Sequence, residues 1–272
     1  MNNFNFFSPT RIIFGKNKIE DLGNIAARYG KKCMLVTTNK NEPALKDLYV
    51  KAINILESAN IAVLHFDEVL PNPPIDIIEK AIALANENNI DFLVGLGGGS
   101  SIDTAKSISI FHEVDKINWS EAYQKYTSPF TMYEKISSKK IPLIAIPTTA
   151  GTGSEVTQAM MVSEYENNEK NCIFHNEAYP EVALIDPTLC LTIPKRLTAA
   201  TGFDAFCHAF ESYLRDEASD ITKAFGIIAI KDIINTLPKL VNDLGNYEYR
   251  ETMSKAACFA GISLANAAAT LP

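Results

Sequence analysis

Three apolar runs separated by helical segments constrain the fold of this chain most. The runs show no polar alternation and cover residues 33–38, 61–66 and 91–96. Unbroken apolar runs of this length are typical of strands that are covered on both faces of a parallel sheet. Between them, residues 43–58 and the segment after Pro74 carry apolar side chains at helical spacing. This order predicts a doubly wound α/β layer, in which ligands bind at the carboxyl ends of the strands.

A glycine-rich turn follows the third predicted strand. It contains Gly95, Gly97, Gly98 and Gly99, and Ser100, Ser101, Ile102 and Asp103 lead from it into a predicted helix. Glycine lets the backbone approach a ligand closely, and free N–H groups at the start of a helix attract phosphate. The dinucleotide pattern GxGxxG fails at its last position, which is Ser100, so an ordinary tight turn stays an alternative.

A second cluster of small and hydroxyl residues follows the strand predicted over residues 141–146. It reads PTTAGTGSE and occupies residues 147–155. Because it falls at the same edge of the sheet, it and the glycine turn would form two walls around one phosphate-rich ligand. Residues 112–140 are charged and aromatic and are predicted to be a surface loop, and a further strand is predicted at 182–187.

Long helices replace the strands after this point. They are predicted over residues 194–214, 219–240 and 249–271. We therefore predict a nucleotide-binding α/β domain, residues 1–189, and an all-α domain, residues 190–272.

The last predicted helix is apolar around its whole circumference from Ala256 to Leu271. Such a helix should be buried on all sides. No sequence follows to cover it, so we expect an incomplete helical domain with an exposed apolar surface that favours self-association.

One helix of the second domain carries two potential metal ligands. Asp204 and His208 lie one helical turn apart on one face, and Glu211 lies near the same face. Carboxylate and imidazole groups both bind iron and zinc, but two ligands do not complete a site. For this pair alone, an aspartate near the start of the helix and a packed histidine is the commoner explanation.

The net charge and the cysteines exclude several function classes. A formal net charge of -7 leaves no broad basic surface, which argues against nucleic acid or an anionic membrane as partner and favours a small substrate. The five cysteines contain no CxxC pair, which is typical of reduced thiols. No apolar run reaches membrane-spanning length, and a cytoplasmic protein is predicted.

Five motifs together resemble the iron-containing alcohol dehydrogenase family, whose fold is shared with glycerol dehydrogenase and dehydroquinate synthase. In chain order they are VLPNPPIDIIEKA, GLGGGSSIDTAK, IPTTAGTGSE, VALIDPTL and PKRLTAATGFDAFCHA. The resemblance implies a Rossmann-like domain that binds NAD or NADP and a helical domain that binds divalent iron, with zinc as an alternative. It also implies a homo-oligomer that interconverts small alcohols and aldehydes or ketones.

The resemblance also assigns roles to single residues of this chain. The expected cofactor contacts are Thr38, Asn39, Asn72, Gly98, Gly99, Ser100, Asp103, Thr148, Thr149 and Lys170. Lys170 would reach the nicotinamide ribose, although a lysine in the turn-like ENNEKN would otherwise be a solvated charge. Asp204 and His208 match two metal ligands of the family's set of one aspartate and three histidines.

Two departures from the family pattern limit these expectations. After the first apolar strand, NAD-preferring relatives carry an acidic residue that bonds the adenosine ribose, whereas this chain has Thr38 and Asn39 followed by Lys40. Cofactor choice therefore stays open, with a slight preference for NADPH. The next family ligand would follow Pro272, so the 272-residue chain is expected to hold metal weakly and to turn over alcohols poorly.

Two alternatives to an alcohol dehydrogenase stay open at this point. One is a polyol dehydrogenase or a carbon-oxygen lyase of the same fold. The other is a nucleotide-binding remnant without catalytic activity.

Overall fold

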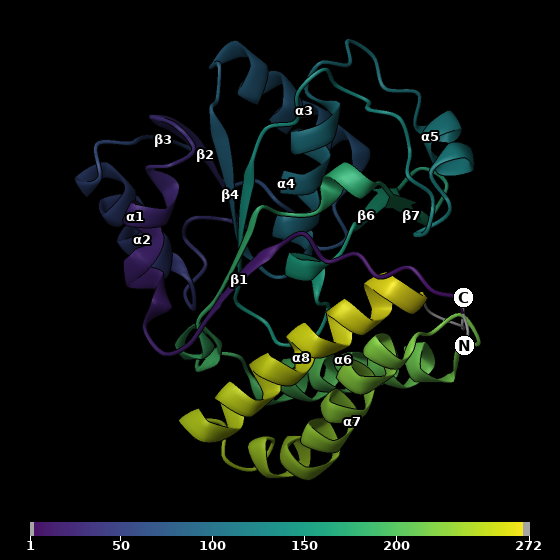
Figure 1. Ribbon diagram of the computed structural model, residues 1–272. Coiled ribbons are helices and arrows are strands. Elements are labelled where there is room, and N and C mark those ends of the chain that lie inside the picture. Colours follow the sequence, from purple (N-terminus) through teal and green to yellow (C-terminus); the bar gives the residue numbers. More distant parts are fainter. Residues whose placement is uncertain (1–2, 269–272) are drawn as a thin grey trace.

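A parallel sheet forms the centre of the computed structural model, which describes residues 3–268 (Figure 1). Within this part of the chain the sheet has six strands, in the spatial order β1 (Arg11–Phe14), β8 (Val182–Ile185), β5 (Leu143–Pro147), β4 (Phe92–Gly97), β2 (Lys32–Val36) and β3 (Ala62–Phe66). All neighbouring strands are parallel. They therefore share one carboxyl edge, where the loops after β2, β3, β4 and β5 gather.

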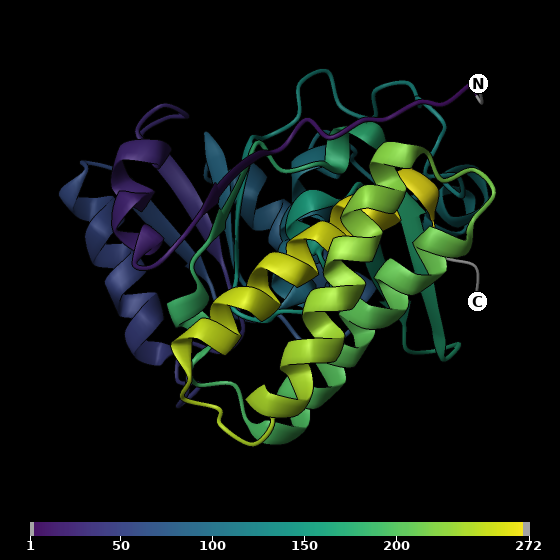
Figure 2. The same cartoon turned by 60° about the horizontal axis from the view of Figure 1, so that its bottom comes forward.

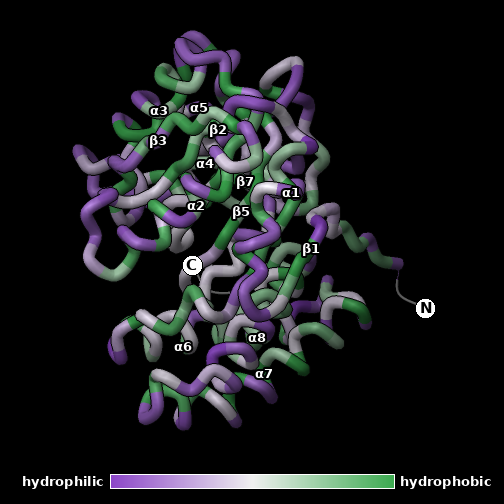
Figure 3. Tube along the Cα trace, turned by 90° about the vertical axis from the view of Figure 1, so that its left-hand side faces the viewer, coloured by the Kyte–Doolittle hydropathy of each residue, from purple (hydrophilic) through white to green (hydrophobic). Residues whose placement is uncertain are grey.

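Helices cover both faces of this sheet. They are α1 (Leu22–Ala26) and α2 (Lys46–Ser58) on one face, and α3 (Ile75–Glu87) and α4 (Gly99–Phe111) on the other. Strand β2 shows why its sequence lacks polar alternation, because Cys33 and Leu35 pack with the first pair of helices while Met34 and Val36 pack with the second. Figure 3 shows the strands β1 and β5 as largely hydrophobic parts of the chain trace. The predicted α/β layer is confirmed.

Residues 112–140 are only in part the surface loop that the sequence predicts. A short helix, α5 (Trp119–Lys125), forms there, and the side chain of Trp119 is buried. The ring of Trp119 lies 5.4 Å from that of Phe111, and its Nε1–H donates to Glu79 Oε1 at 2.8 Å. The prediction was wrong for residues 119–125, because charged and turn-forming neighbours hide the short apolar face that Trp119 and Ala122 form on this helix.

An antiparallel hairpin, which the sequence analysis missed, follows the 3-10 turn η2 (Ser154–Val156). Its strands are β6 (Ala159–Glu164) and β7 (Glu169–Phe174). Lys170 lies on β7 opposite Ser163, and not in a turn as the sequence suggested. The signal was weak because polar residues interrupt both strands and only Met160 and Val162 alternate as fully buried apolar positions in β6.

Three long helices form the second part of the chain, as predicted. They are α6 (Lys195–Leu214), α7 (Asp220–Leu240) and α8 (Tyr247–Ala267), which lie side by side in Figure 2. The 3-10 turn η4 (Pro187–Cys190) joins β8 to them. The change from strands to helices thus falls around the predicted boundary between residues 189 and 190, which stays a prediction. Among the described residues we find no helix with the length and apolar character that a membrane crossing requires.

Helix α8 is buried by this chain itself, which corrects the expectation that it lacks packing partners. Ala256 and Ala260 pack into a core with α6 and α7, while Cys258 and Ile262 pack with residues of β8 and η2. Small side chains on α8 let these elements approach it from several sides. The α/β layer therefore covers the apolar side chains of α8 that were expected to lack packing partners. The predicted end of this helix, residues 269–271, lies outside the described residues.

Exposed apolar side chains occur on α6 and α7 instead. Phe203 and Leu214 of α6 are 60% and 58% exposed, and Ile234 of α7 is 57% exposed. The rings of Phe203, Phe206 and Phe210 form a stacked series along α6, with neighbouring centroids 5.8 and 5.6 Å apart. The expected apolar surface thus exists, but on helices other than the one predicted.

Candidate functional site

The glycine turn joins β4 to α4 at the carboxyl edge of the sheet. Gly97 has φ +153°, a conformation that side chains rarely adopt, and an added Cβ would collide with Ser101. At Gly99 an added Cβ would lie 2.9 Å from Thr152 Cγ2. Gly98 is the N-cap of α4 and no side chain caps this helix end. The first backbone N–H groups of α4 are therefore free of a side-chain cap, as an anion site requires.

Two other loops enclose the start of α4. The backbone N–H of Asn72, in the loop after β3, donates to Ser100 Oγ at 3.2 Å. The N–H of Thr148, directly after β5, donates to Gly97 O at 2.8 Å. Thr149 lies 3.7 Å from the position that a Cβ of Gly98 would take. The structure thus brings Asn72 and the predicted residues of the two walls together around the start of α4.

The predicted ribose end lies at the carboxyl end of β2, next to β4 in the sheet. The hydroxyl of Thr38 forms a 2.8 Å hydrogen bond with Tyr49 OH. Asn39 Oδ1 accepts from the N–H of Asn41 at 2.8 Å, which closes the loop into a tight turn. Both residues lie at the edge where a cofactor would run, and their contact with it stays a prediction.

Asp103 accepts hydrogen bonds from protein groups through both carboxylate oxygens. Ser154 Oγ donates to its Oδ1 at 2.5 Å, and the N–H of Met161 donates to its Oδ2 at 3.0 Å. Burial raises the pKa of Asp103, and the charges of Lys106 and Lys170 oppose that effect. Protein donors thus engage both oxygens of Asp103, and its expected contact with the cofactor stays a prediction.

Lys106 is a buried partner of Asp103 that the sequence analysis did not single out. Its side chain is fully buried, and its Nζ lies 3.9 Å from Asp103 Oδ1. It donates to Ala159 O at 2.6 Å and to Thr157 Oγ1 at 3.2 Å. Burial lowers the pKa of Lys106 to about 8. The i,i+3 spacing of Asp103 and Lys106 in SSIDTAK is the sequence signal that could have revealed the pair.

A buried carboxyl group completes this cluster. Glu155 is 4% exposed, and burial raises its pKa to about 7. Its charge also acts on Cys190 of η4 and Cys258 of α8, so it lies where η2 meets the helical part of the chain. Lys106 and Glu155, whose charges interact, therefore lie between the start of α4 and helix α8.

The two predicted metal ligands face each other on α6. His208 Nε2 lies 3.6 Å from Asp204 Oδ1, and the side chains of His208 and Asp204 are 22% and 45% exposed. His208 Nδ1 is buried and has no hydrogen-bond partner. These oxygen and nitrogen donors suit iron or zinc, which take three or four protein ligands. No group of three His, Cys, Asp or Glu side chains placed to hold a metal ion occurs among residues 3–268.

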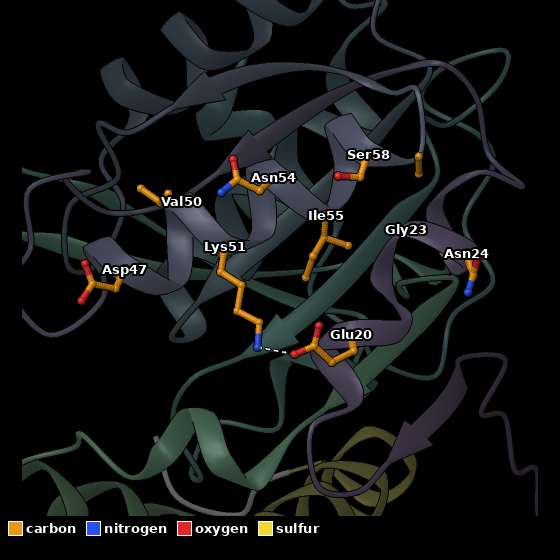
Figure 4. Close-up of a pocket in the computed structure, with 10 residues that line it drawn as sticks. Glu20, Gly23, Asn24, Asp47, Val50, Lys51, Asn54, Ile55 and Ser58 are labelled. Carbon is orange, nitrogen blue, oxygen red and sulfur yellow. Dashed lines mark ion pairs between the residues drawn. The ribbon is translucent and has the colours of Figure 1, made fainter.

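A surface hollow between α1 and α2 lies apart from these groups. Figure 4 shows its lining, in which Lys51 and Glu20 form an ion pair of 2.5 Å. Its other lining residues are Gly23, Asn24, Asp47, Val50, Asn54, Ile55, Ser58 and Ala59. None of them belongs to the carboxyl edge, so the hollow is not part of the site.

Comparison with known proteins identifies the family. Residues 9–187 match the model of the iron-containing alcohol dehydrogenase family, and residues 198–271 match the C-terminal model of the Fe-containing alcohol dehydrogenase family. The chain belongs to the iron-containing alcohol dehydrogenase family, as its motifs indicated.

Curated relatives and solved structures agree with this assignment. The chain is 33% identical over 261 residues to a probable NADH-dependent butanol dehydrogenase of Bacillus subtilis (strain 168), with 96% of this chain and 64% of the relative covered. It is 35% identical over 267 residues to a 1,3-propanediol dehydrogenase of Klebsiella pneumoniae, with 97% and 66% covered.

An iron-containing alcohol dehydrogenase from Thermotoga maritima has the same fold. The TM-score is 0.86 at 33% identity, and the match covers 98% of this chain and 70% of that one. The predicted combination of an α/β Rossmann-like part and an all-α part is thereby confirmed. The chain spans 64% to 66% of the length of these curated relatives.

Proposed function

We propose that this chain binds NAD or NADP along the carboxyl edge of its sheet and serves the interconversion of small alcohols and aldehydes or ketones. The uncapped start of α4, enclosed by the loops that hold Asn72 and Thr149, carries this proposal. The pyrophosphate would lie against the N–H groups of Gly99 and Ser100. Lys170, exposed on β7 and close enough to Asp103 to act on its pKa, would serve the nicotinamide end.

The names of the relatives support the substrate class. They include butanol, methanol and 1,3-propanediol dehydrogenases, and both NADH- and NADPH-dependent members occur. These are small primary alcohols, so we propose a small alcohol or aldehyde as substrate. We also propose a homo-oligomer, because apolar side chains of α6 and α7 are exposed, and a cytoplasmic location, because all five cysteines are free thiols.

Asp204 and His208 would hold a divalent iron or zinc ion. Such an ion, when bound, supplies a Lewis acid that favours loss of the alcohol proton. The residues of this chain would contribute an anionic oxygen and a neutral imidazole nitrogen. Because His208 Nδ1 is buried without a partner, Nε2 is the nitrogen available to the ion.

Titration of the purified chain with NADH and NADPH tests the cofactor site. We expect Gly98→Val to weaken binding of both nucleotides by roughly a hundredfold, because the side chain blocks backbone approach to the phosphates. The substitution should be tolerated by the fold, since a Cβ at Gly98 has only ordinary contacts with Thr149. Gly245→Val is the matched control, because a Cβ there meets no atom within 4 Å. Unchanged affinity in Gly98→Val would remove the turn from the site.

Nucleotide binding without turnover is a second candidate, favoured by one observation. The described residues bring together only two metal ligands, fewer than iron or zinc usually take. Assays of alcohol oxidation with added Fe²⁺ or Zn²⁺ separate the two candidates. Cofactor binding with no turnover at any metal concentration would favour the second, whereas turnover that is lost in His208→Ala would favour the first.

A further inference from the structure

The loops after β2 and β3 form one unit at the carboxyl edge. Strands β2 and β3 are parallel neighbours that end at Val36 and Phe66, which are partners in the ladder. Beyond them the N–H of Thr37 donates to Phe66 O at 2.9 Å, and the N–H of Val69 donates to Thr37 O at 3.2 Å. Residues that follow β3 are therefore fixed beside the loop that holds Thr38 and Asn39.

This unit continues towards the glycine turn. The segment after β3 runs from Asp67 to Asn72, whose N–H donates to Ser100 Oγ at the start of α4. In dinucleotide-binding folds the ribose lies at the carboxyl end of the strand next to the one that carries the glycine turn. Here those two strands are β2 and β4. The segment from Asp67 to Asn72 thus connects the proposed ribose position with the proposed phosphate position.

Asp67 brings to this position the carboxylate that the loop after β2 lacks. Its Oδ2 lies 3.5 Å from Lys40 Nζ and accepts from the backbone N–H of Lys40 at 3.4 Å. The Asp67 side chain is 22% exposed, whereas that of Lys40 is 62% exposed. The less exposed carboxylate of Asp67 therefore contacts both the backbone and the cation of Lys40, and neutralises that cation.

We propose that Asp67 selects NADH over NADPH at this site, an inference that rests on the proposed nucleotide binding. The carboxylate can accept a hydrogen bond from a ribose hydroxyl, as carboxylates do in NAD sites. A 2′-phosphate would instead meet the negative charge of Asp67 and would have to compete with it for Lys40. The sequence alone suggested a slight preference for NADPH, because it shows Thr38, Asn39 and Lys40 but not the residue that faces them.

The test is a fluorescence titration of wild type and variants with NADH and with NADPH at low ionic strength, where charge effects are large. We expect wild type to bind NADH more tightly. Asp67→Asn should raise the affinity for NADPH relative to NADH roughly tenfold, because it frees the charge of Lys40. Asparagine keeps an acceptor for the N–H of Lys40, so the loop should keep its shape.

Two further variants show whether the effect belongs to this pair. Asp67→Asn combined with Lys40→Met should lose most of the gain in NADPH affinity, since the freed cation is absent. Glu68→Gln is the matched control, because it removes the same charge one residue further on, where the partner is Lys80 of α3 at 2.6 Å. We expect Glu68→Gln to leave the ratio of the two affinities unchanged.

The outcomes separate this inference from the proposed function. If both nucleotides bind but Asp67→Asn shifts their ratio no more than Glu68→Gln does, Asp67 does not select the cofactor, while the proposed binding site stands. If wild type binds NADPH more tightly than NADH, the selection of NADH is refuted. Absence of binding for both nucleotides would overturn the proposed function and this inference together.

Discussion

The cofactor edge and the metal pair are built in opposite ways. At the edge, loops after four parallel strands and the start of α4 come together from residues that lie far apart in sequence, such as Asn72 and Thr149. The metal pair consists of Asp204 and His208 on one helix, one turn apart. A helix alone can align two ligands but cannot surround an ion, whereas a parallel sheet gathers many groups at one edge. The edge therefore offers a far more complete site.

Replacement of the buried Lys106 should have the largest effect on stability, because its side chain holds together the residues beneath the cofactor edge. Lys106→Met leaves Asp103 without its cation and leaves the acceptors of Lys106 unpaired, which should lower the free energy of unfolding by about 3–5 kcal/mol. Urea unfolding measures this loss. Lys51→Met is the control, since its 2.5 Å pair with Glu20 lies at the surface and should contribute about 1 kcal/mol or less. Equal losses of free energy of unfolding in both variants would contradict a stabilising role for the buried Lys106.

The close contact of Gly153 with helix α8 should be almost as sensitive to substitution. Gly153 has φ +63°, and a Cβ there would lie 2.5 Å from the Cα of Gly261 in α8. Gly153→Ala should therefore cost about 2–4 kcal/mol through strain and overpacking. Thermal unfolding compares it with Gly245→Ala, which meets nothing within 4 Å. A small effect at Gly153 would mean that the two parts of the chain pack together only loosely.

The pH dependence of stability tests the buried carboxyl group between the two regions. Burial raises the pKa of Glu155 to about 7 from its usual 4.5, so the folded state binds more protons than the unfolded state between these values. Stability is then greatest below pH 4.5, as far as this group is concerned, and falls as pH rises to 7, by up to about 3 kcal/mol. Glu155→Gln should lack this fall. Parallel pH profiles for both proteins would show that Glu155 is not the cause.

Substitution in the predicted metal pair, Asp204 and His208, should have the smallest effect. With two ligands the chain should bind Zn²⁺ weakly, and His208→Ala should reduce the affinity roughly tenfold or less. Calorimetry with Zn²⁺ measures this change, and His112→Ala, on a histidine that contacts Ser109 O, is the control. Tight binding that survives His208→Ala would place the ion elsewhere and would reverse the comparison between the two regions.

The sequence predicted those parts of the molecule that depend on local patterns. Unbroken apolar runs predicted the strands, because both faces of β2 and β4 are covered. Glycines between a strand and a helix predicted an anion site at the start of α4, which stays a prediction, and four-residue spacing predicted that Asp204 and His208 would face each other. These features follow from backbone geometry within one element or one turn.

Only the tertiary structure decided which distant groups meet. It buried α8 against β8 and η2, placed Lys106 against Asp103 and Thr157, and set Asp67 beside Lys40. None of these contacts follows from periodicity, because each depends on the order of strands in the sheet and on the packing of helices over it. The carboxylate that we propose for the ribose end therefore does not follow β2, where sequence patterns place it, because the sheet sets Asp67 of the loop after β3 beside Lys40.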